Sequence, residues 1–188
     1  MGKTTISEVL SVKLNCKLIK INDLAIENDF VLGIDDDKGY KIIDIDKLDE
    51  KVSEIIANNE GPIIFEGHLS HLCSGADEMI ILRVRPEILK ERLASRNYSD
   101  SKIRENLEAE AIGVCTSEAF TRYGGIIQEI DVTDLNVDEA VELVCDIVND
   151  VADCPAGEID FMDWLINNPW ILFLANIDLS HILWVNIF

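Results

Sequence analysis

Short apolar runs alternate with amphipathic stretches along this chain, and that alternation constrains its fold more than any other feature. Residues 63–65, 79–84 and 126–132 have the length and apolar character of strands in a parallel sheet. Segments with helical spacing of apolar residues lie between and around them. The alternation predicts an α/β fold in which helices cover both faces of a parallel sheet.

Periodicity and turn residues place the other elements. We expect helices at residues 4–14, 23–29, 47–58, 86–95, 103–120 and 137–151, a strand at 17–21, and a hairpin within 31–46 that turns at 36–39. Strand 63–65 is expected to be buried on both faces. Residues 154–157 resemble a linker, and 158–167 could form a short helix. The expected organisation is one domain, residues 1–168, followed by an apolar tail, 169–188, whose role the sequence does not indicate.

Charge and cysteine content exclude several classes of protein. The net charge of −20 repels nucleic-acid phosphates, so no autonomous nucleic-acid binding is expected. The five cysteines are odd in number and widely spaced, which indicates neither a disulfide framework nor a zinc site and favours a cytoplasmic protein. The apolar tail is too short and too interrupted for a membrane span, so no membrane partner is expected.

The sequence Gly2-Lys3-Thr4-Thr5 has the form of the second half of a phosphate-binding loop. In such a loop the lysine reaches the phosphates of ATP and the first threonine hydroxyl holds Mg²⁺. The predicted helix that starts here would also direct its N-terminus at an anion. The alternative is a polar helix start without a ligand.

Glu66 and His68 follow directly after the predicted strand at 63–65. A carboxylate at such a strand end can hold a metal ion or position a substrate or water in phosphoryl transfer, and a nearby histidine can assist. The alternative for Glu66 is a hydrogen bond to a loop. We give little weight to His71, because a lone histidine more often has a structural role.

Four arginines lie within residues 83–96, and phosphoryl transfer needs guanidinium groups to neutralise charge. Arg92 and Arg96 are four positions apart on one predicted helix, so both can face one side. We expect Arg92 to bind substrate and Arg96 to close over the transferring group. Ion pairing with the abundant acidic residues is the alternative, and for Arg83 and Arg85 it stays open.

Asp44 and Asp46 alternate in a predicted extended segment, so both could meet one Mg²⁺ ion or a ribose. A solvated edge with a helix cap is an equally good interpretation. Tyr98 could stack on a nucleobase, although a packed tyrosine is the default.

Together these residues resemble the adenylate kinase isoenzyme 6 family, which comprises archaeal and nuclear P-loop ATPases similar to nucleoside monophosphate (NMP) kinases. The resemblance covers residues 1 to about 167. It rests on the stretches GKTT (2–5), NDLAIEND (22–29), IDIDKL (43–48), FEGH (65–68) and LRVRPEILKERLASRNYSDSKIRENLEAE (82–110).

The resemblance implies a P-loop NTPase core with a monophosphate-binding segment near residues 20–43 and a lid near 95–105. Such proteins transfer the γ-phosphoryl group of ATP to a nucleoside monophosphate with Mg²⁺, and they also hydrolyse ATP. They are implicated in maturation of the small ribosomal subunit, with a small-subunit ribosomal protein and pre-ribosomes as partners.

By position, the resemblance assigns ATP and Mg²⁺ binding to Gly2, Lys3, Thr4 and Thr5. It makes Arg96 the lid arginine. It aligns Glu66 and His68 with an Asp-x-His motif of eukaryotic members, so Lys3, Glu66, His68 and Arg96 are the expected catalytic residues, and Thr4 and Glu66 the metal-binding ones.

The sequence departs from the family pattern in two places. The first strand and the Gly-x-x-Gly-x half of the loop are absent, which predicts weak ATP binding by the sequence as it stands. Ile26 occupies the position of an arginine that would contact the monophosphate, which makes ATP hydrolysis the better supported activity. A catalytically inactive fragment or binding module of the same family is the alternative.

Overall fold

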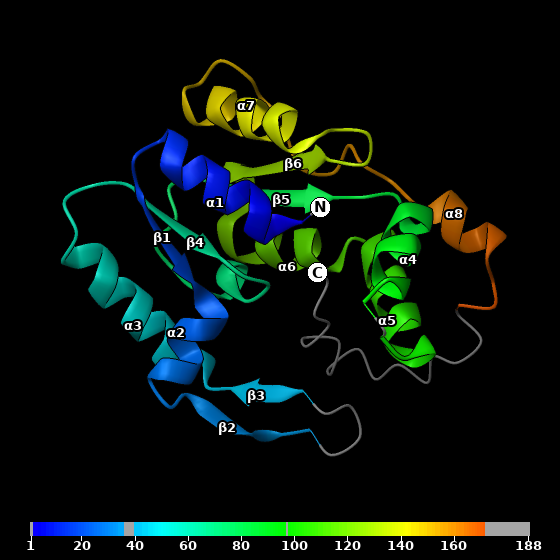
Figure 1. The fold of residues 1–188 in the computed structure, drawn as a ribbon, viewed down its shortest axis with the longest axis horizontal. Coiled ribbons are helices and arrows are strands. Elements are labelled where there is room, and N and C mark those ends of the chain that lie inside the picture. Colours follow the sequence, from blue (N-terminus) through cyan, green and yellow to red (C-terminus); the bar gives the residue numbers. More distant parts are fainter. Residues whose placement is uncertain (1, 36–39, 97, 172–188) are drawn as a thin grey trace.

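Helix α1 (Lys3–Lys13) runs along two small parallel sheets and contacts elements of both (Figure 1). The structure, a computed structural model, describes residues 2–35, 40–96 and 98–171. It confirms the predicted α/β fold with parallel strands. Because α1 begins beside the end of strand β4 (Ile63–Glu66), the start of this helix lies where a parallel sheet binds its ligands.

Four strands form the two parallel sheets. Strand β1 (Lys17–Lys20) pairs with β4, and β5 (Met79–Arg83) pairs with β6 (Ile127–Asp131). Within the described residues, no strand pairing joins β4 to β5. The parallel arrangement is as predicted, but the strands pair as two sheets rather than one.

The remaining elements follow the predicted order along the chain. An antiparallel hairpin, β2 (Val31–Ile34) with β3 (Lys41–Ile43), projects from the body, and its predicted turn at 36–39 lies outside the described residues (Figure 1). The helices are α2 (Ile21–Glu27), α3 (Ile45–Ala57), α4 (Pro86–Ala94), α5 (Asp100–Ala111), α6 (Val114–Tyr123), α7 (Val137–Val148) and α8 (Met162–Asn167), with 3₁₀ turns η1 (Ser70–Leu72) and η2 (Gly124–Ile126).

Helices cover both faces of sheet β5–β6, as predicted. Ile80 and Leu82 pack against the core that α1 and α7 form, whereas Met79 and Ile81 pack with Ala119 of α6. This alternation follows from the two-residue period of a strand. The face of sheet β1–β4 opposite α1 is closed by α2 and α3, through a core that includes Phe65.

Local sequence signals explain where several helices begin and end. Asn136 and Glu139 form a reciprocal capping box at the start of α7. The predicted helix at 103–120 is wrong, because Gly113 adopts a positive φ of 67° and separates α5 from α6. Glycine adopts this left-handed conformation without the steric cost that other residues carry.

Two further expectations need correction. Every residue of β4 is only partly buried, although its two faces are covered, Ile64 packing against the core of α1 and Phe65 against the core of α2 and α3. Residues 154–157 are not a linker. Pro155 bridges Gln128 beside β6, and the carbonyl of Cys154 accepts a 2.7 Å hydrogen bond from the amide of Glu129.

The end of the described chain packs on α4. Ile171 is buried in the core that Leu89 and Leu93 of α4 supply, and the ammonium of Lys90 lies 4.8 Å from the ring centre of Trp170. The predicted apolar tail from residue 172 onward lies outside the described residues. Among the helices that the structure does describe, none has the length and apolar character needed to cross a membrane.

Candidate functional site

The start of α1 meets the end of β4 through a direct hydrogen bond. The Thr4 hydroxyl donates to Oε1 of Glu66 over 3.1 Å. A threonine hydroxyl and a carboxylate are both hard oxygen donors of the kind that Mg²⁺ prefers. The structure therefore brings together the two side chains that the sequence predicts as metal-binding.

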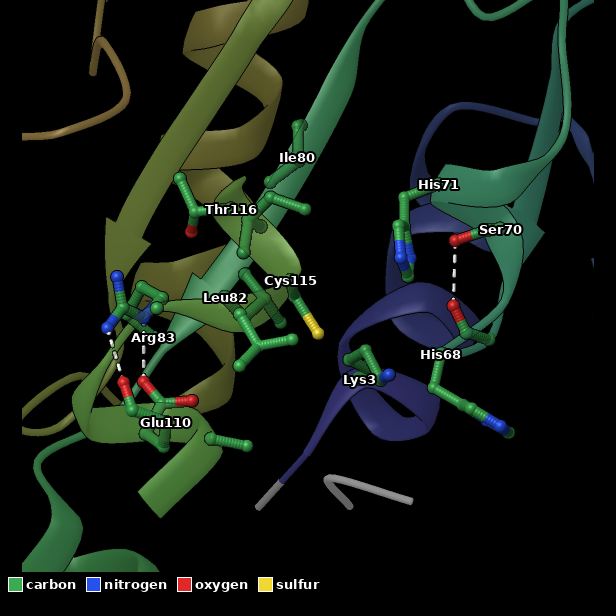
Figure 2. Close-up of a pocket in the computed structure, with 15 residues that line it drawn as sticks. Lys3, His68, Ser70, His71, Ile80, Leu82, Arg83, Glu110, Cys115 and Thr116 are labelled. Atoms are coloured by element: carbon green, nitrogen blue, oxygen red, sulfur yellow. Dashed lines mark hydrogen bonds and ion pairs between the residues drawn. The ribbon is translucent and has the colours of Figure 1, made fainter. Parts of the chain in front are cut away.

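A small cavity of about 50 Å³ lies next to this contact, between the end of β4 and strand β5 (Figure 2). Its ionisable and nucleophilic lining groups come from both sides of that gap: Lys3, His68 and His71 on one side, and Arg83, Glu110 and Cys115 on the other. A single water needs roughly 10–15 Å³ of such volume. The cavity therefore has room for a few waters or a small anionic group, and not for a nucleoside.

Lys3 lines this cavity from the start of α1 (Figure 2). Burial lowers the pKa of its ammonium, while Cys115, Glu66 and Glu110 act in the opposite direction by favouring the charged form. A phosphate group would favour the charged form further. Lys3 is thus placed where an anionic ligand would offset the cost of its burial.

His68 also borders the cavity. Its Nδ1 lies 3.4 Å from the side-chain amide nitrogen of Asn22, so Nδ1 is placed to accept a hydrogen bond. Burial, together with the charge of Lys3, lowers the pKa of His68 to about 4. The ring is therefore neutral near pH 7 and can orient a ligand through a hydrogen bond.

His71, to which sequence reasoning gave little weight, is a buried side chain that lines the same cavity. Its Nε2 lies 2.9 Å from Oε2 of Glu118 on α6. The two residues are 47 positions apart, and no local pattern links them. Only the packing of α6 against η1 reveals the pair.

Arg83 has a structural environment. It is 4% exposed, as are Glu110 and Glu129, and its Nε donates to Glu110 over 2.7 Å while Nη1 contacts Glu129. Thr116 also contacts Glu129. For Arg83 the ion-pair alternative therefore holds, and the same is true of Arg85, which pairs with Asp134 at the surface over 3.0 Å.

Arg92 and Arg96 do not line the cavity. Arg92 lies in α4, whereas Arg96 is an exposed residue just beyond the end of that helix. The expectation that both lie on one helix is therefore wrong, because α4 ends at Ala94. Arg96 stands at the start of the predicted lid, and its role over the transferring group stays a prediction.

Asp44 and Asp46 do not share an extended face. Asp44 caps helix α3, accepting a 3.2 Å hydrogen bond from the amide of Lys47, and this bond lowers the pKa of Asp44. Asp46 is an exposed residue in the first turn of the helix. The helix-cap interpretation is confirmed for Asp44, and the argument that both carboxylates meet one ligand is wrong.

The predicted monophosphate segment and the predicted lid touch each other. The ammonium of Lys102 lies 4.8 Å from the ring centre of Tyr40 and 4.4 Å from that of Tyr98. The Tyr40 hydroxyl also donates to Glu105 over 3.3 Å. These contacts join the hairpin to α5.

Thr4, Glu66 and Lys3 fit the demands of a magnesium–phosphate ligand. Mg²⁺ is usually held by one or two protein oxygens, with phosphates and waters supplying the rest. The described residues contain no group of three or more histidine, cysteine or acidic side chains that could hold a metal ion. The N-terminus of the eleven-residue helix α1 adds amide donors and a favourable dipole for anions.

The fold and this site define a nucleotide-binding α/β protein of the P-loop NTPase class, and comparison with known proteins supports that assignment. A family model described as "AAA domain" matches residues 1–113. Three archaeal relatives carry the name "Putative adenylate kinase". The one from Methanothermobacter thermautotrophicus is 40% identical over 166 residues, covering 88% of this chain and 94% of the relative.

The other two are more distant. The Methanocaldococcus jannaschii protein is 38% identical over 148 residues, covering 79% of this chain and 80% of its own length. The Saccharolobus islandicus protein is 30% identical over 178 residues, covering 95% of this chain and 89% of the relative. The chain therefore belongs to this archaeal adenylate kinase-like family of P-loop proteins.

Proposed function

We propose that this protein is a Mg²⁺-dependent nucleoside monophosphate kinase that transfers the γ-phosphoryl group of ATP to a monophosphate such as AMP. The observation that carries the proposal is the Thr4–Glu66 hydrogen bond beside Lys3, at the start of a helix and the end of a parallel strand. The names of the archaeal relatives support the same reaction.

The proposed roles follow from placement. Lys3 and the α1 amides neutralise and hold the phosphates, while Thr4 and Glu66 hold Mg²⁺ when it is bound. The ion supplies charge neutralisation to the reacting phosphates. His68 orients a ligand oxygen, and Arg96 closes over the transferring group from the lid. Catalysis by such a site consists of positioning and charge neutralisation.

The size of the cavity indicates where each part of the substrates would lie. Nucleotide-sized ligands need pockets of roughly 300–1,000 Å³, far more than the 50 Å³ beside Lys3. Only a phosphate-sized group fits there. The nucleosides would therefore lie outside it, with the acceptor near the aromatic rings of Tyr40 and Tyr98.

Product analysis tests the reaction class directly. The purified protein is incubated with Mg²⁺, ATP and each common nucleoside monophosphate in turn, and diphosphates are separated by anion-exchange chromatography. We expect a nucleoside diphosphate derived from the acceptor, with less product from Arg96→Ala. Absence of an acceptor-derived diphosphate for every monophosphate would contradict the kinase assignment and favour an inactive binding module.

The proposal extends to ATP hydrolysis and to a cytoplasmic role in maturation of the small ribosomal subunit. Leu32 and Ile34 are 65% and 63% exposed on the hairpin, in a chain whose net charge is −20. An apolar strip on an acidic protein suits a basic partner such as a small-subunit ribosomal protein. Leu32→Asp with Ile34→Asp should weaken binding of such a purified protein, and unchanged affinity would contradict this extension.

A further inference from the structure

The pair formed by buried His71 and partly buried Glu118 has the arrangement of a proton-accepting site. An ionised carboxylate can only accept hydrogen bonds, so the 2.9 Å contact requires the proton of His71 to sit on Nε2. The second ring nitrogen, Nδ1, is then the basic one. A carboxylate that fixes the tautomer of a histidine in this way also stabilises the ring once it gains a proton.

His71 opens onto the cavity that Lys3 lines, whereas Glu118 is not among the lining residues (Figure 2). The imidazole of His71 thus contacts Glu118 through Nε2 and also lines the cavity that Lys3 lines. His68 differs, because its Nδ1 faces the amide nitrogen of Asn22. Of these two histidines, His71 is the one whose partner is a hydrogen-bond acceptor, which leaves Nδ1 of His71 without the proton.

We propose that His71 is the catalytic residue that orients and deprotonates the water in ATP hydrolysis, with Glu118 as its positioning residue. This inference rests on the proposed function. The water oxygen forms a bond to the γ-phosphorus as the bond between that phosphorus and the β,γ-bridging oxygen breaks. The bridging electron pair leaves with ADP, and the water proton passes to Nδ1 of His71 and then to solvent.

The γ-phosphoryl group can be transferred either to a monophosphate or to water, and the two reactions differ in their need for a base. In transfer to a monophosphate, the nucleophile is a phosphate oxygen of the acceptor. When that phosphate is ionised, the oxygen carries no proton, so no base is needed to remove one. Hydrolysis uses water, whose proton must be accepted. His71 should therefore matter much more for hydrolysis than for transfer. The charged or titratable groups that share its cavity are Lys3, His68, Arg83, Glu110 and Cys115.

A purely structural role is the competing explanation, because the pair also ties α6 to η1. Two neighbouring residues of α6 also tie that helix to the segment just after η1: Arg122 donates to Ser74 over 2.6 Å, and the Tyr123 hydroxyl contacts the Cys73 carbonyl. Arg122 donates in addition to Asp49 of α3 over 2.7 Å. None of these residues lines the cavity. Arg122→Gln is therefore a matched control that loosens the same helix without touching the reacting groups.

The test measures two rates with the full purified chain: ATP hydrolysis without an acceptor, and phosphoryl transfer to AMP. We expect His71→Gln to lower the hydrolysis rate about 100-fold or more, the usual contribution of a general base, and to lower transfer less than about tenfold. Glu118→Gln should lower kcat for hydrolysis with little change in KM. Arg122→Gln should change neither rate by more than about twofold.

Coupling between the two residues gives an independent readout. If Glu118 acts only through His71, the double variant His71→Gln/Glu118→Gln should hydrolyse ATP no more slowly than His71→Gln alone. Added imidazole should restore part of the hydrolysis lost in His71→Gly. If His71→Gln does not fold, as judged by its circular dichroism, Glu118→Gln still tests the inference.

Several results would overturn it. An unchanged rate of ATP hydrolysis in His71→Gln would do so. The inference would also fail if His71→Gln and Arg122→Gln lowered the hydrolysis rate and the transfer rate by the same factors. Transfer without hydrolysis in the wild type would remove this inference and leave the kinase assignment standing. Hydrolysis without transfer would remove the kinase assignment, and the effect of His71→Gln on hydrolysis would still decide the role of His71.

Discussion

Thr4 and Glu66 are 62 positions apart in sequence, yet the hydroxyl of one donates to the carboxylate of the other over 3.1 Å. The contact joins the N-terminus of α1 to the C-terminal end of β4. A helix start offers positive charge to a phosphate, and a carboxylate offers negative charge to a metal ion. In the proposed site, the helix start would hold the phosphate and the carboxylate would hold the magnesium ion.

Removing the charge of Glu66 should weaken the use of Mg²⁺. In Glu66→Gln the hydrogen bond from Thr4 can persist, but the anionic donor is lost. We expect the Mg²⁺ concentration for half-maximal ATP turnover to rise about tenfold or more, in line with ligand-shell substitutions elsewhere. Glu8→Gln, which breaks an exposed pair with Lys20, is the control. A Mg²⁺ titration that Glu66→Gln leaves unchanged would speak against this metal site.

The buried cluster around Arg83 should be essential for stability. Arg83→Met leaves Glu110 and Glu129 buried without their cation, and loss of one partner from a buried pair typically costs about 3–5 kcal/mol. Arg85→Met, at the exposed pair with Asp134, should cost less than about 1 kcal/mol. Urea denaturation measures both. If Arg83→Met and Arg85→Met lowered the free energy of unfolding by equally small amounts, the guanidinium of Arg83 would not be what stabilises the buried cluster.

Lys102 should hold the hairpin against α5. Its ammonium faces the rings of Tyr40 and Tyr98, and each such contact at a partly exposed site is worth about 0.5–1 kcal/mol. We expect Lys102→Met to speed amide hydrogen exchange in β2 and β3. Lys90→Met removes a similar contact with Trp170 far along the chain and should leave the hairpin unchanged. Identical exchange of the hairpin in Lys102→Met would rule out this role.

The Tyr40 hydroxyl should lose its proton at a higher pH than an ordinary tyrosine. Burial, with the nearby charge of Glu105, raises the pKa of its hydroxyl to about 12. An unfolded tyrosine ionises near pH 10, so the unfolded state loses its proton first and stability should fall as the pH rises from about 10 to 12. Tyrosinate absorbance in wild type and Tyr40→Phe identifies this group. A Tyr40 that titrates like free tyrosine would contradict the packing of its hydroxyl.

Local signals in the sequence located most elements correctly. Apolar periodicity placed α1, α3 and α7, and strand–helix alternation predicted parallel strands, which the structure shows in the pairing of β5 with β6. The sequence also pointed to Lys3, Thr4, Glu66 and His68, because the residue types that bind phosphate and metal recur at helix starts and strand ends. The structure brings these four side chains to one place.

What sequence reasoning missed depends on contacts between distant segments. A single glycine at 113 divides a stretch that is helical by composition, because its backbone turns through a positive φ. Glu129 lies in an apparently apolar strand, and its burial is offset by Arg83 from the neighbouring strand and by hydrogen bonds from Thr116 and the amide of Gly157. The His71–Glu118 pair likewise forms only once α6 packs on η1.

The most direct test of the central claim is the rate of γ-phosphoryl transfer to AMP by Lys3→Ala, compared with wild type and with Lys13→Ala. Lys13 lies on the same helix but pairs at the surface with Glu142. If Lys3 neutralises the reacting phosphates, Lys3→Ala should lower kcat/KM by about 100- to 1,000-fold, and Lys13→Ala should match wild type. A Lys3→Ala protein that transfers phosphate at the wild-type rate would contradict the assignment of this site.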